Sequence, residues 1–133
     1  MPAFNSDDHA INASPALIST FLAQPVNLKE ILPGDRIENW SVEGDSCAFK
    51  IKGLAEIQLK VTSIEENRVI YSSTSEKPFQ FKLIISITGS ETSVVNVSFD
   101  ADVNSFMAMM LKTPLTNFLN SLAESLKLKY AAA

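Results

Sequence analysis

Few side chains in this sequence are suited to metal, nucleophilic or acid–base chemistry. The chain contains one histidine, His9, and one cysteine, Cys47. A metal site needs several converging ligands, and these two residues have no recognisable metal-binding spacing. His9 stands between Asp8 and Ala10 in a stretch with poor hydrophobic alternation, so we expect it to be a solvated surface residue. We therefore predict neither a metal site nor a cofactor.

Proton transfer would require an acid, a base or a nucleophile in the interior, with a partner within reach. The strand side chains that are expected to face inward include no Asp, Glu, Lys, Arg or His. Tyr71 is the best remaining candidate, with Ser73 or Ser75 as its partner, although the pattern leaves open which way Tyr71 faces. Cys47 falls on the buried face of its strand and is expected to pack as a small hydrophobic residue. No catalytic residue is predicted.

Length and composition limit the function classes. A chain of 133 residues is expected to form a single domain, 1–133, and its 46% hydrophobic residues exclude a disordered chain. The formal charge is −4 and the basic residues are scattered singly, which argues against a nucleic-acid partner because phosphates attract a concentrated cationic surface. The amino terminus has no signal-peptide pattern and no segment is apolar enough to span a membrane. We therefore expect no integral membrane association and a cytoplasmic location.

The longest element that could position these residues lies at the carboxy-terminal end. Asn104–Tyr130 has the only long amphipathic helical pattern in the chain, and Asn104 is a favourable N-cap. Pro114 interrupts the hydrogen-bond ladder within this pattern, so we expect a kink or a short break there, with the main helix running from Pro114 to about Lys129. One apolar stripe follows the pattern at spacings of three or four residues: Met107, Leu111, Leu115, Phe118, Leu122 and Leu126.

The chain before this helix predicts mainly antiparallel strands. From Asp35 onward apolar residues alternate with polar ones, which is typical of strands with one buried face. Short helices are expected at Pro15–Ala23 and Val26–Leu32, and Ala3–Ile11 is a candidate first strand. The pattern predicts six strands, or seven with the first. The side chains expected to face inward are Trp40 and Val42, then Cys47, Phe49 and Ile51, then Ile57, Leu59 and Val61, and then alternate residues of Phe79–Ile87 and Val95–Val103.

The order of these elements resembles that of the START-like superfamily, also called helix-grip or SRPBCC, which includes polyketide cyclases, plant pathogenesis-related allergens and lipid-transfer domains. The resemblance covers nearly the whole chain. Its local features are Leu32-Pro33 at the close of the second helix, Ile37–Trp40 at the opening of the second strand, and the Met-rich turn after Asn104. None of these is a catalytic signature. The resemblance implies an α+β helix-grip fold, in which a curved antiparallel sheet of six to seven strands wraps around a long C-terminal helix, with two short helices after the first strand.

The same resemblance implies a pocket for a small hydrophobic or lipid-like molecule between the sheet and the long helix. Methionine adapts to ligands of different shape, but protein cores also use it to fill gaps. Aromatic stripes likewise pack cores more often than they line binding sites. With both interpretations open, the candidate ligand-binding residues are Trp40, Phe49, Ile57, Tyr71, Phe81, Phe99, Met107, Met110 and Phe118.

Three functions are compatible with these observations. The leading hypothesis is non-catalytic binding, or transport, of a small hydrophobic or lipid-like molecule. The second is an enzyme of the polyketide cyclase or aromatase kind, which would require Tyr71 and a serine to point inward. The third is a protein-interaction module with a filled core and an exposed apolar patch, for example around Ile84. The shape of the interior distinguishes the three.

Overall fold

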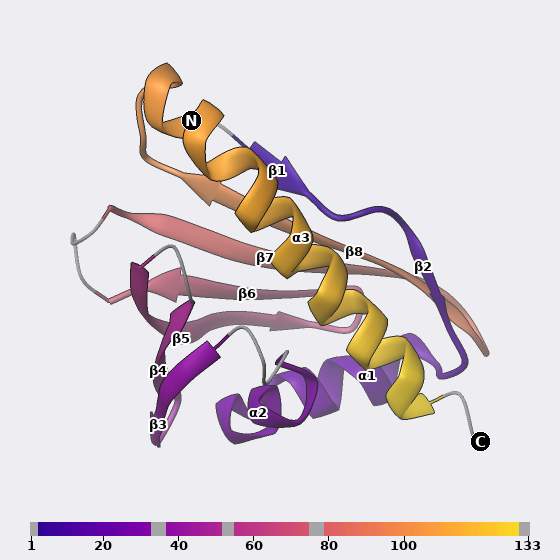
Figure 1. Ribbon diagram of the computed structural model, residues 1–133. Coiled ribbons are helices and arrows are strands. Elements are labelled where there is room, and N and C mark those ends of the chain that lie inside the picture. The colour runs from indigo at the N-terminus through magenta and orange to yellow at the C-terminus, as the bar shows by residue number, and fades with distance from the viewer. Residues whose placement is uncertain (1–2, 33–36, 52–54, 75–78, 131–133) are drawn as a thin grey trace.

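A long helix crosses a curved antiparallel sheet in the computed structural model, which describes residues 3–32, 37–51, 55–74 and 79–130 (Figure 1). The strands are β1 (Ala3–Asn5), β2 (His9–Ile11), β3 (Ile37–Glu43), β4 (Ser46–Ile51), β5 (Ala55–Glu65), β6 (Arg68–Ser73), β7 (Phe81–Gly89) and β8 (Ser93–Ala101). Their order across the sheet is β1-β8-β7-β6-β5-β4-β3, and β2 also pairs with β8. The expected sheet is therefore confirmed, with its first strand divided into β1 and β2.

Hydrophobic alternation gives the sheet one apolar face. In β7 and β8, Leu83 pairs with Phe99 and Ile85 pairs with Val97, and all four side chains are buried. Paired residues project from the same face of an antiparallel sheet, so burial of one strand face extends to its neighbour. In β6, where the pattern was ambiguous, Tyr71 belongs to the buried set. The predicted inward faces of β4, β7 and β8 are confirmed.

Strand β3 departs from regular alternation at a β-bulge. The register shifts between Glu38 and Ser41, and Asn39 inside this shift has a φ of 58°. Asparagine tolerates this left-handed conformation better than most residues. The next residue, Trp40, packs against Phe49 of β4. The bulge thus lies directly beside an aromatic contact of the interior.

Two short helical segments follow β2, as the sequence predicted. In α1 (Pro15–Leu22) the Ser14 side chain accepts a hydrogen bond from the backbone N–H of Leu17 at 3.3 Å. The second segment starts as a 3-10 turn, η1 (Pro25–Asn27), and continues as α2 (Leu28–Ile31). Both segments lie near the carboxy-terminal end of the long helix (Figure 1).

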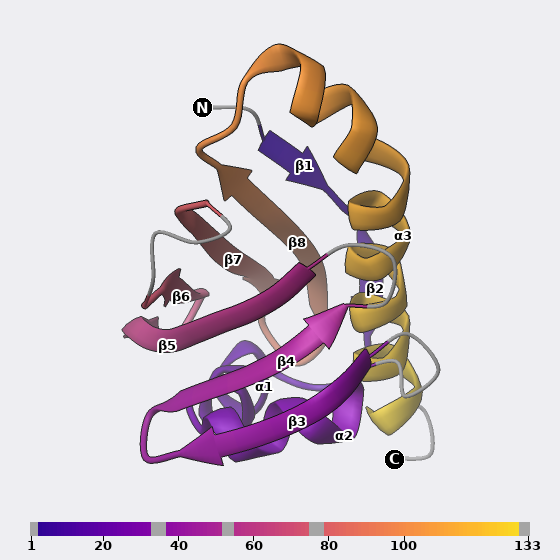
Figure 2. The ribbon, with the colours of Figure 1, turned by 60° about the vertical axis from the view of Figure 1, so that its left-hand side comes forward.

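The long helix α3 (Ser105–Tyr130) is continuous, with Pro114 in its interior. The Oδ1 of Asn104 accepts a hydrogen bond from the backbone N–H of Met107 at 2.8 Å, which confirms the predicted N-cap. The expectation that the main helix begins at Pro114 is wrong. The helix begins at Ser105, after the Asn104 cap, and continues through Pro114. The amino-terminal part of α3 bends away from the rest (Figure 2), as expected where a proline has no N–H for the preceding turn. None of the described helices is long and apolar enough to cross a membrane.

Candidate functional site

One row of aromatic side chains joins the sheet to α3. The ring centroid of Phe49 lies 6.1 Å from that of Trp40 and 6.1 Å from that of Phe118, and both pairs are stacked. Ile57 pairs with Phe49 across β4 and β5 and is buried with it. The structure therefore brings these four candidate residues together between the β3–β5 part of the sheet and α3.

A second aromatic cluster lies toward β1 and β8. The rings of Phe81 and Phe99 stack with centroids 4.8 Å apart, and Phe79 packs edge-on against both. Phe4 of β1 pairs with Phe99 in the ladder, so the two side chains emerge on the same face of the sheet. Phe4 thus connects the edge of the sheet to two of the candidate residues.

Tyr71 points inward, but its hydroxyl is engaged with the backbone. The side chain is fully buried, and its O–H donates a hydrogen bond to the carbonyl of Leu22 at the end of α1. Burial, with a smaller effect of nearby Cys47, raises the pKa of the Tyr71 phenol, so the hydroxyl stays protonated. Ser73 accepts a hydrogen bond from the backbone N–H of Phe81 at 3.1 Å. The other proposed partner, Ser75, lies outside the described residues.

Cys47 is buried in β4, as predicted for a small hydrophobic residue. Burial raises the pKa of its thiol to about 12. The thiolate is the nucleophilic form of cysteine, and this pKa keeps Cys47 in the thiol form at neutral pH. Among the residues that the structure describes, no three His, Cys, Asp or Glu side chains are grouped so that they could hold a metal ion.

The amino-terminal turns of α3 expose an apolar surface, which we call the Met-rich turn. Its exposed side chains are Phe106, Met107, Met109 and Met110, of which Met109 is 79% and Met110 is 65% exposed. Full burial of apolar residues begins after Pro114, with Leu115. Two of the candidate residues, Met107 and Met110, are therefore separated from the buried candidates along the helix.

A groove of about 570 Å³ lies between β1 and this part of α3. Small-molecule sites commonly have volumes of roughly 300–1,000 Å³, so the groove is large enough for a ligand. The residues that line this β1–α3 groove are Ala3, Phe4 and Asn5 from the strand and Ala108, Met109, Lys112 and Thr116 from the helix.

None of the nine candidate residues is among those that line the β1–α3 groove. Phe99 lies next to it through its pairing with Phe4, and Met110 follows Met109 on the helix. The groove depends on the packing of β1 against a helix more than one hundred residues later, which no local pattern encodes. One signal was present in the sequence, since Lys112 is the only charged residue from Ser105 to Ala123.

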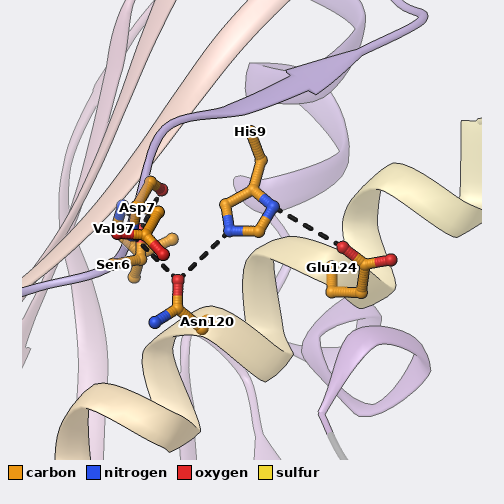
Figure 3. Close-up of polar contacts among 6 residues, drawn as sticks. All are labelled: Ser6, Asp7, His9, Val97, Asn120 and Glu124. Atoms are coloured by element: carbon orange, nitrogen blue, oxygen red, sulfur yellow. Dashed lines mark hydrogen bonds and ion pairs between the residues drawn. The ribbon is translucent and has the colours of Figure 1, made fainter.

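His9 is not a solvated surface residue, and that expectation is wrong. Its side chain is only 15% exposed, because α3 packs over β2. Figure 3 shows its ring between two α3 side chains, with Nε2 3.2 Å from Oδ1 of Asn120 and Nδ1 3.6 Å from Oε2 of Glu124. An amide oxygen only accepts hydrogen bonds, so the first contact requires the proton on Nε2. The same Asn120 oxygen accepts the backbone N–H of Asp7 at 2.8 Å.

No protein-family model and no curated protein sequence matches the chain. Solved structures do match it. A START superfamily protein from Mycobacterium smegmatis superposes with a TM-score of 0.69 over 98% of this chain and 97% of that chain, at 12% identity. The chain has the START-like, helix-grip fold.

A plant enzyme with the START-like architecture also matches. The X-ray structure of norcoclaurine synthase from Thalictrum flavum has a TM-score of 0.74 over 99% of this chain and 87% of that chain, at 17% identity. The same synthase in complex with dopamine and hydroxybenzaldehyde has a TM-score of 0.73, at 18% identity, over 98% of this chain and 87% of that chain. At these identities the likeness concerns the START-like fold.

Proposed function

We propose that this protein binds a small hydrophobic or lipid-like molecule between its sheet and the amino-terminal part of α3. The β1–α3 groove is the observation that carries the proposal. It sets Phe4 and Met109 beside a space of about 570 Å³, next to a helix turn whose other large apolar side chains are exposed. Exposed methionines are typical of surfaces that accept ligands of varied shape. The START-like fold supports the same function, because the structure of norcoclaurine synthase, which has this fold, contains bound dopamine and hydroxybenzaldehyde.

The contacts behind the groove suggest how the ligand is held. Phe4 pairs with Phe99, and Phe99 stacks on Phe81, so the groove wall at Phe4 is backed by a buried aromatic cluster. In this proposal Met107 and Met110 fold over the ligand from the helix. The remaining candidates, Trp40, Phe49, Ile57, Tyr71 and Phe118, do not line the groove, and in this proposal they belong to the core that supports the sheet.

The hydrogen bonds of Tyr71 and Ser73, the two candidate residues for proton transfer that the structure describes, favour binding over cyclase chemistry. The Tyr71 hydroxyl donates to the Leu22 carbonyl, and Ser73 accepts from the backbone of Phe81. A general acid or base must instead reach the reacting atom of the substrate. Moving Tyr71 to a substrate would leave the Leu22 carbonyl without this partner in a buried position.

A fluorescence titration with the neutral apolar dye Nile red tests the proposal. The full chain is expected to show saturable binding, and Met109→Gln is expected to weaken it several-fold, because the amide introduces polar atoms into the groove wall. Leu128→Gln is the matched control, since Leu128 is exposed on the last turn of the same helix. Native mass spectrometry of the gently purified chain, followed by solvent extraction, would identify a bound molecule. Non-saturable dye binding together with the mass of the bare chain would contradict the proposal.

A further inference from the structure

Lys112 is the one charged side chain among the described residues that line the β1–α3 groove, and its position on α3 is unusual. From Ser105 to Ala123 the helix carries no other charged residue, so no carboxylate stands three or four positions away to pair with it. Ala108 and Thr116 lie one turn before and one turn after Lys112, and both line the groove. These neighbours are small, so they leave the lysine accessible from the groove.

The other side chains near Lys112 favour a negative ligand group. Neither Phe4 nor Met109 offers a charge to compensate the ammonium, and none of the ion pairs among the described residues involves Lys112. Asp100, an acid close to β1 in the sheet, pairs with Ala3, whereas Phe4 pairs with Phe99. Since successive residues of a strand project from opposite faces, Asp100 projects from the face opposite Phe4.

The edge strand adds backbone polar groups to the same groove. Ser6 donates its backbone N–H to the carbonyl of Val97 in β8 at 2.8 Å. In an antiparallel ladder the residues that exchange such bonds alternate with residues whose peptide groups point the other way. Asn5 therefore directs both its backbone N–H and its C=O away from β8, toward the edge of the sheet. The described residues of the groove thus combine apolar walls, one cation and the backbone N–H and C=O of Asn5 at its rim.

We propose that the β1–α3 groove selects anionic single-chain amphiphiles of the fatty-acid class. The carboxylate binds the ammonium of Lys112, and the alkyl chain lies along Phe4 and Met109. The inference rests on the proposed hydrophobic-ligand function and adds the charge and shape of the ligand. A charge-assisted hydrogen bond to Lys112 distinguishes a carboxylate from neutral or cationic head groups of the same chain length.

Calorimetric titration with three decyl compounds tests this selectivity. Decanoate, decanol and decyltrimethylammonium are titrated into the full chain at concentrations below micelle formation. Lys112→Met keeps an unbranched apolar stem and removes the charge, while Lys60→Met makes the same charge change on the exposed side of β5. We expect decanoate to bind at least about tenfold more tightly than the other two, and Lys112→Met alone to abolish that preference. Circular dichroism confirms that both variants are folded.

A second pair of variants separates the ligand class from the location of the site. Ala108→Leu fills the groove and is expected to weaken decanoate binding about tenfold or more, whereas Ala16→Leu on the exposed face of α1 leaves it unchanged. If decanol binds as tightly as decanoate and Lys112→Met has no effect, the anionic class is wrong while hydrophobic binding stands. If none of the three compounds binds, both proposals fail. Binding only to vesicles of anionic phospholipid would overturn the inference in favour of a membrane surface.

Discussion

The imidazole Nε2 of His9 lies 3.2 Å from the amide oxygen of Asn120, a residue 111 positions later in the chain. Together with the Asp7 backbone N–H on the same oxygen, this contact fastens the amino-terminal edge of the sheet to α3. The edge that it fastens includes β2 and continues into β1, which forms one wall of the β1–α3 groove. The contact that stabilises this edge therefore also supports the wall of the proposed ligand site.

Replacing Asn120 tests how much this contact contributes to stability. Asn120→Ala leaves the Asp7 N–H and the His9 Nε2 without their acceptor, so we expect the free energy of unfolding to fall by about 1–2 kcal/mol. Urea denaturation measures the change. Asn117→Ala on an exposed position of the same helix is the control, with an expected change below about 0.5 kcal/mol. Equal effects of the two substitutions would show that the contact contributes nothing.

Removing the Tyr71 hydroxyl tests its structural role. In Tyr71→Phe the ring still fills its buried position but the Leu22 carbonyl loses its donor, so we expect a loss of about 1–3 kcal/mol. Amide hydrogen exchange is expected to speed up in α1, whose end this bond holds. Tyr130→Phe, at the partly buried end of α3, is the comparison and should change stability by less than about 0.5 kcal/mol. Unchanged exchange in α1 would contradict the assignment.

The two parts of α3 should differ in their energetic contribution. Phe118 is buried and stacks on Phe49, so Phe118→Ala is expected to cost about 3–5 kcal/mol of unfolding free energy. Met110 is mostly exposed, so Met110→Ala is expected to change stability by less than about 0.5 kcal/mol. Denaturant titrations of both variants compare them directly. A large loss for Met110→Ala would mean that the Met-rich turn packs into the core.

Cys47 should contribute to a loss of stability at alkaline pH. Burial raises the pKa of its thiol from 9.0 to about 12, so the unfolded chain loses this proton first as the pH rises. The contribution of the protonated Cys47 thiol to stability is fully present below about pH 9 and is lost as the pH rises toward 12. Over this range the free energy of unfolding falls by up to about 1.4 kcal/mol per pH unit. We expect Cys47→Ala to have a shallower alkaline decline in urea denaturation series, although Tyr71 still contributes. Identical alkaline slopes would exclude this effect.

Pro114 should cost stability because it interrupts the α3 ladder. Pro114→Ala supplies an N–H for the carbonyl of Met110, so we expect a gain in unfolding free energy of up to about 3 kcal/mol. Thermal unfolding followed by circular dichroism measures it. Pro15→Ala is the comparison, since the first position of α1 needs no such donor and no gain is expected there. A Pro114→Ala variant with unchanged or lower stability would show that the bend is held by other contacts.

Local patterns predicted most of the elements. The alternation of Phe81, Leu83, Ile85 and Ile87 identified β7 because a strand with one buried face needs apolar residues at every second position. Asn104 identified the start of α3 because its side chain can satisfy a free amide of the first turn. The pattern did not decide the facing of Tyr71, since both sides of β6 carry apolar residues. The packing of α1 against the sheet decided it.

The sequence by itself determined the periodicity of the strands, the amphipathic stripe of α3 and the START-like order of elements, because each depends on residues that are close in the chain. Only the tertiary structure decided the position of His9 and the existence of the β1–α3 groove. Both arise where the first residues of the chain pack against a helix more than one hundred residues later. Such contacts depend on how the side chains of two elements pack together. Lys112 and Phe4 line the same groove only because α3 packs against β1.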